Sequence, residues 1–276
     1  VVTSTAVTAV DEDAAYSYTV TATDVDVGDT LTMTGTTVPS WLTFDATTGV
    51  LAGTPLNANV GANSVVITIN DGTVDVTDTF TITVANTNDA PTFTSTAVTA
   101  VDEDAAYSYT AAASDDDGDA VTLVGTTIPA WMTFDATTGA LTGTPTNAEV
   151  GSHAVVITAT DTNSASTTDS FTVVVANTND APTIASALSD ATIAEDSAYS
   201  LDVSGMCTDV DVGDTLTYTI SGNPSTLTIA SGIISGTPLQ ADIGSHAITV
   251  VCTDSGSASA SDSFTLFVTN VNDAPD

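Results

Sequence analysis

Short segments of the chain alternate between hydrophobic and polar residues. In residues 16–23, tyrosine, valine and alanine take every second position, and serine and threonine take the positions between them. Successive side chains of a β-strand point to opposite faces of a sheet, so this pattern predicts strands that bury one face and expose the other. The same alternation covers residues 31–35, 65–69 and 80–84.

Turn-forming residues separate these segments. Glycine, aspartate, asparagine and proline recur at intervals of roughly ten residues, and no segment shows the period of a helix. About seven short strands in about 90 residues are typical of a Greek-key sandwich of the immunoglobulin type. The sequence therefore predicts an all-β fold.

The whole pattern occurs three times. The string Asn-Asp-Ala-Pro begins at Asn88, Asn179 and Asn272, and Gly-Thr-Pro also recurs in each repeat. Self-similarity at a fixed period indicates tandem domains. We predict three β-sandwich domains in a linear array, at residues 1–90, 91–181 and 182–276. Because the sequence starts and stops in mid-pattern, we expect a segment of a longer array.

Charge narrows the possible partners. The chain has 35 acidic residues and no lysine or arginine, which gives a formal net charge of −35. Each carboxylate must therefore be solvated, accept hydrogen bonds or bind an external cation. Nucleic acid and anionic membrane surfaces are excluded as partners, because both are bound through basic side chains. The sequence has no run of 18 apolar residues, so we expect no membrane insertion of this segment.

Motifs typical of enzymes are missing from the sequence. It contains no Gly-x-Ser-x-Gly, no His-Glu-x-x-His and no phosphate-binding loop. Its two histidines, His153 and His246, hold equivalent positions of different repeats, so they cannot share a site within one chain. We expect them to be structural and the protein not to be an enzyme. Composition alone leaves open a carboxylate pair of the glycosidase kind.

Acidic residues recur at fixed positions of the repeats. Three of the four glutamates, Glu12, Glu103 and Glu195, are each followed by aspartate and, four residues on, by tyrosine. Aspartates recur at three further places. In one loop they are Asp24, Asp26 and Asp29 of the first repeat, Asp115, Asp117 and Asp119 of the second, and Asp209, Asp211 and Asp214 of the third. At the end of a strand they are Asp71, Asp161 and Asp254, and in the linker they are Asp89, Asp180 and Asp273. Turn formation explains Asp45 and Asp135. It does not explain glutamates confined to one position.

These residues resemble the cadherin superfamily, and within it the dystroglycan-type, cadherin-like Ig-like repeats of bacterial surface proteins. The resemblance covers all three repeats. Cadherins hold calcium between successive domains. Their ligands come from a glutamate at the base of one domain, a Leu-Asp-Arg-Glu loop, an Asp-x-Asn-Asp-Asn linker, and Asp-x-Asp plus a lone aspartate of the next domain.

The resemblance implies two complete junction sites and two half-sites. The ligands implied at the first junction are Glu12, Asn86, Asn88, Asp89, Asp115, Asp117 and Asp161. Those implied at the second are Glu103, Glu149, Asn177, Asn179, Asp180, Asp209, Asp211 and Asp254. The half-sites would be formed by Asp24, Asp26 and Asp71 at one end and by Glu195, Asp242, Asn270, Asn272 and Asp273 at the other.

The match to cadherins is incomplete in the loop and in the linker. The Leu-Asp-Arg-Glu loop reads Leu-Asn-Ala-Asn at residues 56–59, and the linker reads Asn-Thr-Asn-Asp-Ala. Fewer charged ligands imply fewer or weaker ions, above all at the first junction.

Calcium is the cation that suits such ligands. Ca²⁺ binds about six to eight carboxylate, amide and carbonyl oxygens in flexible geometry, whereas zinc and copper prefer nitrogen or sulfur. An EF-hand beginning at Asp24 is excluded, because its twelfth position is Gly35 rather than glutamate. The alternative to calcium is that the aspartates only begin turns and solvate loops.

The two cysteines both lie in the third repeat. Cys207 and Cys252 each precede an implied ligand, Asp209 or Asp254, by two residues. If those aspartates converge on one ion, the cysteines should be neighbours on adjacent strands and on one face. We predict a disulfide, which requires an oxidising compartment. Two buried free thiols are the alternative.

Trp41 and Trp131 hold equivalent positions in the first two repeats, where the third has Thr226. We interpret them as core aromatics rather than as binding platforms. Together these patterns predict a calcium-stiffened extracellular stalk or filament shaft of a surface or secreted protein. Its partners would be further copies of the repeat or chain, or surface glycans and proteins. A self-assembling fibre subunit and a glycan-binding module are the alternatives.

Overall fold

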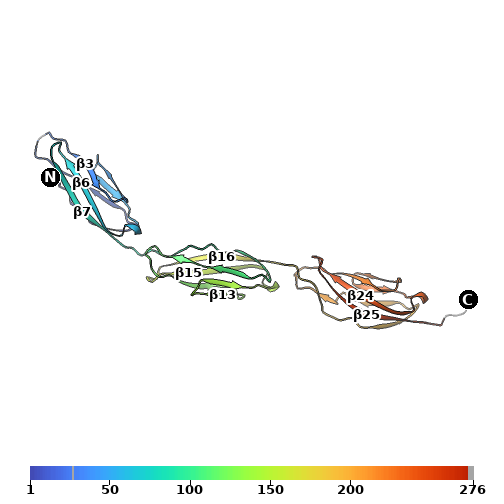
Figure 1. Cartoon of the computed structure of the whole chain (residues 1–276). Coiled ribbons are helices and arrows are strands. Elements are labelled where there is room, and N and C mark those ends of the chain that lie inside the picture. Colours follow the sequence, from blue (N-terminus) through green and yellow to red (C-terminus); the bar gives the residue numbers. More distant parts are fainter. Residues whose placement is uncertain (27, 273–276) are drawn as a thin grey trace.

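The computed structural model describes residues 1–26 and 28–272 of the chain. Three β-sandwiches follow one another end to end, with the first and the third repeat at opposite ends of the array (Figure 1). The first sandwich is inclined to the common direction of the other two (Figure 1). The predicted all-β architecture of three tandem sandwiches is confirmed. The boundaries at residues 90/91 and 181/182 stay a prediction.

Among its described residues, the first repeat contains seven strands and one turn of 3₁₀-helix. They are β1 (Ala9–Asp11), β2 (Tyr16–Thr19), β3 (Thr32–Thr37), β4 (Leu42–Asp45), β5 (Val50–Gly53), η1 (Asn57–Asn59), β6 (Gly61–Asn70) and β7 (Asp75–Ala85). One sheet has the order β1-β7-β6-β3 and the other the order β2-β5-β4. The first strand pairs with β7 in parallel, and the remaining pairs of both sheets are antiparallel.

The second repeat reproduces this arrangement. Its elements are β8 (Thr92–Phe93), β9 (Ala100–Asp102), β10 (Tyr107–Thr110), β11 (Ala113–Ser114), β12 (Thr122–Thr127), β13 (Met132–Asp135), β14 (Ala140–Gly143), η2 (Asn147–Glu149), β15 (Gly151–Thr160) and β16 (Ser166–Ala176). The sheets run β12-β15-β16-β9 and β10-β14-β13, and β8 pairs with β11.

The third repeat has the same topology. Its elements are β17 (Thr183–Ile184), β18 (Ala191–Ala194), β19 (Tyr199–Asp202), β20 (Cys207–Thr208), β21 (Thr217–Ser221), β22 (Leu227–Ala230), β23 (Ile233–Gly236), η3 (Gln240–Asp242), β24 (Gly244–Thr253) and β25 (Ser259–Thr269). The sheets run β18-β25-β24-β21 and β19-β23-β22, and β17 pairs with β20.

Each repeat has its own hydrophobic core, which follows from the alternation in the sequence. On β6, Val65, Ile67 and Ile69 point inward and are buried, while the residues between them face outward. Trp41 packs at the edge of the first core, with its ring 5.8 Å from that of Tyr16 and edge-on to it. Trp131 holds the same place in the second repeat. The interpretation of both tryptophans as core aromatics is confirmed.

Cys207 and Cys252 form a disulfide, as predicted, with their Cα atoms 6.6 Å apart. The expected placement on adjacent strands is wrong, however. Cys207 lies on β20, which pairs with β17, whereas Cys252 lies on β24 of the four-stranded sheet. Both residues are buried against the third core, so the bond ties the β17-β20 pair to the four-stranded sheet.

The two histidines are structural in their contacts. The Nε2 of His153 donates to the carbonyl of Glu149 at 2.6 Å, and that of His246 donates to the carbonyl of Asp242 at 2.7 Å. In the first repeat, the side-chain amide of Asn63 makes the same bond to the carbonyl of Asn59. Each contact joins the first residues of a long strand to the 3₁₀-turn that precedes it.

Within the described part of the chain, no helix has both the length and the apolar character needed to cross a membrane.

Candidate metal centres at the repeat junctions

The glutamate that recurs in every repeat lies at the end of a sandwich from which the linker leaves. Glu12 follows β1 directly, and its backbone NH donates to the carbonyl of Ala85 at the end of β7. Its side chain is only 2% exposed. One carboxylate oxygen, Oε1, accepts the backbone NH of Thr87 at 2.7 Å, whereas Oε2 is buried without a hydrogen-bond partner. The parallel pairing of β1 with β7 therefore directs a buried negative charge toward the linker.

The linker and the next repeat bring two more carboxylates to this glutamate. The backbone NH of Asp89 donates to Oδ2 of Asp117 at 2.7 Å, and the side-chain amide of Asn57 donates to Oδ1 of Asp117 at 2.8 Å. Carboxylate oxygens of Glu12, Asp89 and Asp117 all lie within 4.8 Å of one another. One acidic cluster thus combines the base of one repeat, the linker and the loop of the next repeat.

Two further predicted ligands at the same junction belong to the second repeat. Asp115 accepts the backbone NH of Asp117 through Oδ1, and its Oδ2 is buried and unpartnered. The carboxylate of Asp161 accepts the side-chain amide of Asn88 at 2.8 Å and the backbone NH of Ala165 at 2.8 Å. Asn88 and Asp161 therefore connect the linker to the second repeat.

The second junction repeats this geometry. Glu103 is 3% exposed, accepts the backbone NH of Thr178 at 2.6 Å through Oε1, and has a buried, unpartnered Oε2. Asp211 accepts the backbone NH of Asp180 at 2.8 Å and the side-chain amide of Asn147 at 2.8 Å. Glu103, Asp180 and Asp211 again have carboxylate oxygens within 4.8 Å of one another.

A second acidic cluster lies at the second junction. It is formed by Asp209, Asp214 and Asp254, whose oxygens also lie within 4.8 Å of one another. The Oδ2 atoms of Asp209 and Asp214 are buried without a hydrogen-bond partner. Asp254 accepts the side-chain amide of Asn179 at 2.9 Å.

The linker aspartates have perturbed pKa values. Loss of solvation raises the pKa of Asp89, and repulsion from Asp117 and other carboxylates raises it further. The pKa of Asp180 is raised by loss of solvation and by repulsion from Asp104 and Asp211. By contrast, the amide of Asn88 lowers the pKa of Asp161 by donating to its charged form. Proton binding is thus favoured at Asp89 and Asp180, which lie near other carboxylates, and disfavoured at Asp161, which accepts a hydrogen bond from an amide.

Several predicted ligands are engaged within their own repeat. Glu149 accepts the backbone NH and the hydroxyl of Thr146, and Asp242 accepts the backbone NH of Leu239 and the hydroxyl of Thr226. Asn59 caps η1 in the same way, through the backbone NH of Leu56. This position therefore closes a 3₁₀-turn in each repeat whether it is amide or acid. At position 59, asparagine therefore replaces the glutamate of the cadherin loop and still caps the 3₁₀-turn.

The remaining predicted residues lie at the surface or at the ends. The carboxylate of Asp71 caps its own turn through the backbone NH groups of Thr73 and Val74. Asp24 and Asp26 form an exposed acidic cluster with Asp29. Glu195 is buried and keeps an unpartnered Oε2, as its two counterparts do. Exposed side chains belong to Asn86, Asn177, Asn270 and Asn272. Asp273 lies outside the described residues.

Asn57 and Asn147 contact the sites, although the sequence analysis did not include them. Each is the first residue of a 3₁₀-turn and donates to an aspartate of the next repeat. Their signal in the sequence was the asparagine at the second position of the four-residue loop, one residue after Leu56 or Thr146. Asp214 was also missed as a ligand, although its recurrence in the acidic loop was visible.

The donor set fits calcium. Every candidate ligand offers oxygen, from carboxylates or side-chain amides, and calcium prefers such hard ligands in flexible arrangements. The unpartnered oxygens of Glu12 and Glu103 are buried, and a buried polar atom without a partner is costly unless something satisfies it. The residues present at both junctions are therefore able to hold a divalent cation.

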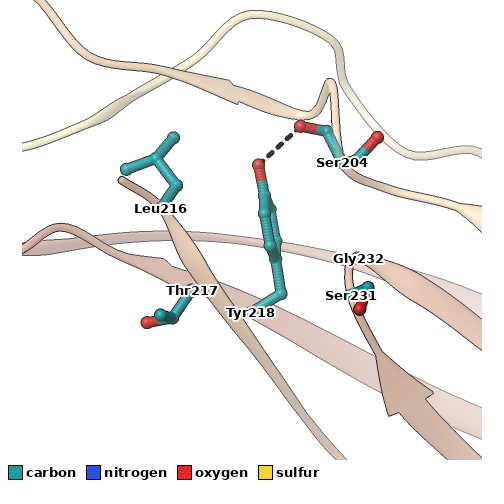
Figure 2. Close-up of a pocket in the computed structure, with 6 residues that line it drawn as sticks. All are labelled: Ser204, Leu216, Thr217, Tyr218, Ser231 and Gly232. Atoms are coloured by element: carbon teal, nitrogen blue, oxygen red, sulfur yellow. Dashed lines mark hydrogen bonds between the residues drawn. The ribbon is translucent and has the colours of Figure 1, made fainter. Parts of the chain in front are cut away.

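The third repeat also has a shallow surface groove. It is lined by Ser204, Leu216, Thr217, Tyr218, Ser231 and Gly232. Figure 2 shows the Tyr218 ring standing between these residues, with its hydroxyl donating to the carbonyl of Ser204 at 2.7 Å. The groove presents one aromatic ring and neutral side chains, without a carboxylate among the residues that line it.

Comparison with known families agrees with this fold. The chain matches the family described as "Putative Ig domain" three times, at residues 1–85, 90–176 and 181–269. It belongs to this family. The matched segments coincide with the three sandwiches.

A curated relative is the serine-rich adhesin for platelets of Staphylococcus aureus. It is 34% identical over 129 residues, which cover 44% of this chain and 5% of the adhesin. The same adhesin from strain MRSA252 is also 34% identical over 129 residues, covering 9% of its length. The chain thus spans a small part of the relatives that it matches.

Solved structures with a similar fold are cadherin domains. Extracellular cadherin domains 1–5 of protocadherin gamma B2 align with 99% of this chain and 60% of theirs, at a TM-score of 0.57 and 20% identity. Domains EC22–24 of mouse cadherin-23 align with 96% of this chain and 95% of theirs, at a TM-score of 0.51 and 18% identity. These similarities show a cadherin-like fold in tandem.

Proposed function

We propose that this chain is a calcium-stiffened segment of an extracellular adhesion or structural protein, serving as a stalk or a filament shaft. The observation that carries the proposal is the pair of buried, unpartnered glutamate oxygens, Glu12 Oε2 and Glu103 Oε2, each within a three-carboxylate cluster at a repeat junction. The chain has no lysine or arginine to neutralise them.

The proposed mechanism is mechanical. Each cluster joins residues of one repeat, the linker and the next repeat, so repulsion among its carboxylates acts directly on the angle between neighbouring sandwiches. The ligands of the first cluster are Glu12, Asp89 and Asp117, and those of the second are Glu103, Asp180 and Asp211. A bound Ca²⁺ supplies the positive charge that removes this repulsion. The repeats would then form a stiff rod.

An extracellular location and a role without catalysis are part of this proposal. The Cys207–Cys252 disulfide requires an oxidising compartment. One relative is named as an adhesin, and the similar folds are cadherin domains. We infer a surface or secreted protein that is not an enzyme, with further repeats, other copies of the chain, or surface glycans and proteins as its partners.

Thermal unfolding of the full chain with and without calcium tests the proposal. A ligand that binds only the folded state raises the melting temperature in proportion to the logarithm of its concentration. We expect the melting temperature to rise as calcium is added from micromolar to millimolar concentrations, and to rise less at equal concentrations of magnesium. A melting temperature that is independent of calcium across this range would overturn the proposal.

A further inference from the structure

The loop after the lone aspartate differs between the two junctions at two positions, Thr162 against Ser255 and Asn163 against Gly256. Asp161 and Asp254 are equivalent, since each accepts a backbone NH from the residue four positions later, Ala165 or Ala258. Two residues after the aspartate, the second repeat has Asn163 and the third has Gly256. The side chain at this position reaches the outer part of the first junction, and the second junction has no such side chain.

Asn163 binds two residues of the first junction. Its side-chain amide donates to Oδ2 of Asp119 at 2.8 Å and also to Oδ1 of Asn88. Asn88 in turn donates to the carboxylate of Asp161. The Asn163 amide therefore donates a hydrogen bond to Asp119, and it also holds the linker side chain of Asn88 in place.

The second junction lacks this amide, and its carboxylates converge instead. Asp214, the counterpart of Asp119, accepts the hydroxyl of Ser255 through Oδ1 and keeps a buried, unpartnered Oδ2. The Oδ2 of Asp209 is buried and unpartnered as well, as is that of its counterpart Asp115 at the first junction. The difference lies in Asp214, which clusters with Asp209 and Asp254, whereas Asp119 is bonded to Asn163. Two buried oxygens without donors thus point to a cation among these three residues.

A side chain at position 256 would displace the Asn179 amide from this arrangement. A Cβ atom built at this position would lie 1.9 Å from Oδ1 of Asn179, the linker amide. The amide oxygen of Asn179 therefore lies where a side chain at position 256 would begin. The amide nitrogen of Asn179 donates to Asp254, a member of the cluster, at 2.9 Å.

We propose that the two junctions are not equivalent, and that the Asn163 amide takes the place of one cation at the first junction. The second junction binds calcium both at Glu103, Asp180 and Asp211 and at Asp209, Asp214 and Asp254. The first junction binds it at Glu12, Asp89 and Asp117, while its outer carboxylate, Asp119, is satisfied by a hydrogen bond. This inference rests on the proposed calcium binding; it assigns a ligand role to Asp214, while Gly256 leaves room for the Asn179 amide.

A matched pair of substitutions in the full chain tests it. Asp214→Asn and Asp119→Asn make the same change at equivalent positions of the two loops. Bound calcium per chain is measured by equilibrium dialysis and elemental analysis. We expect Asp214→Asn to bind one ion fewer than the wild-type chain and Asp119→Asn to bind the same number.

Asn163→Gly provides the reverse test, since it gives the first junction the residue found at the second. We expect this variant to bind one ion more than wild type, and the combination with Asp119→Asn to return the number to the wild-type value. Equal effects of Asp214→Asn and Asp119→Asn, or an unchanged count in Asn163→Gly, would overturn the non-equivalence of the junctions. Absence of calcium from the wild-type chain would overturn the proposed function itself.

Discussion

The side-chain amide of Asn57 donates to Oδ1 of Asp117 at 2.8 Å, from the 3₁₀-turn of one repeat to the acidic loop of the next. Asn147 and Asp211 make the same contact at the second junction. Each junction therefore contains a direct bond between sandwiches that needs no cation. It also orients the aspartate that contributes to the acidic cluster.

Removal of this amide should loosen a junction without changing its charge. For Asn147→Ala we expect calcium affinity at the second junction to fall about tenfold, because residues that orient metal ligands typically contribute 10- to 100-fold. Calorimetric titration of the full chain measures this. Gln240→Ala is the matched control, since Gln240 holds the same position in η3 of the third repeat. An equal loss in both variants would contradict a role for Asn147 at the junction.

The buried glutamate should have opposite effects with and without calcium. In Glu103→Gln the buried charge is removed, and the new amide can donate to Asp180 or Asp211. Without calcium, we expect the free energy of unfolding to rise by about 1–3 kcal/mol, which is typical of relieving a buried unsatisfied group. With calcium, we expect affinity to fall at least about tenfold, because one charged ligand is lost. Denaturant unfolding and calcium titration measure the two effects.

Glu149→Gln is the control for this substitution. Its carboxylate caps η2 through the backbone NH and the hydroxyl of Thr146. We expect a change in the stability of the second repeat and an unaltered calcium affinity. A loss of affinity equal to that of Glu103→Gln would instead favour Glu149 as a ligand, as its position in the sequence implied.

Calcium binding should weaken in mild acid. The pKa values of Asp89 and Asp180 are raised, first by loss of solvation and then by neighbouring carboxylates. A carboxyl with a raised pKa binds its proton more tightly in the folded state. Without calcium, these two groups therefore destabilise the junction progressively as the pH rises through the window between the ordinary and the raised pKa. Protons and calcium compete for the same oxygens, so affinity should fall as the pH drops through that window.

Calcium titrations across this pH range measure the effect. Asp89→Asn should reduce the dependence on pH. Asp45→Asn should leave it unchanged, because Asp45 lies in a turn of its own repeat, where backbone and hydroxyl donors lower its pKa. A calcium affinity independent of pH in the wild-type chain would contradict the assignment of Asp89 and Asp180 to the sites.

Reduction of the disulfide should affect the third repeat alone. Cys207 and Cys252 are 45 residues apart and connect the β17-β20 pair to the four-stranded sheet of that repeat. A cross-link closing a loop of this size typically stabilises a domain by about 2–4 kcal/mol. We expect Cys207→Ser with Cys252→Ser to lower the unfolding temperature of the third repeat and to leave the first two transitions in place. Calorimetry resolves them. A uniform loss across all repeats would show that the sandwiches unfold as one unit.

The sequence predicted the fold through features that repeat. Alternation identified long strands such as β6 and β7. Recurrence at equivalent positions singled out Glu12, Asp89 and Asp117, and the resemblance to cadherins implied that they share one site. The structure places these three together. The cysteine pair was also predicted, although its path across the sandwich depended on the pairing of β20 with β17, which is a tertiary property.

Other parts of the sites were not accessible from the sequence. An acidic residue at position 149 fits two interpretations from the sequence, a cadherin-like ligand or a cap of the 3₁₀-turn. The hydrogen bond from Thr146, which only the structure shows, favours the cap. The donation from Asn147 to Asp211 spans 64 residues and depends on how neighbouring sandwiches meet. The difference between Asn163 and Gly256 can be interpreted only once the positions of the linker amides, Asn88 and Asn179, are known.

Small-angle X-ray scattering of the full chain, in calcium and then in excess chelator, measures calcium stiffening itself. We expect a narrow distribution of long dimensions in calcium and a shorter average dimension with a broader distribution in chelator, reversed when calcium is restored. Glu12→Gln combined with Glu103→Gln should make the dimensions insensitive to calcium at the concentration that extends the wild-type chain. Identical scattering of the wild-type chain in calcium and in chelator would contradict calcium stiffening.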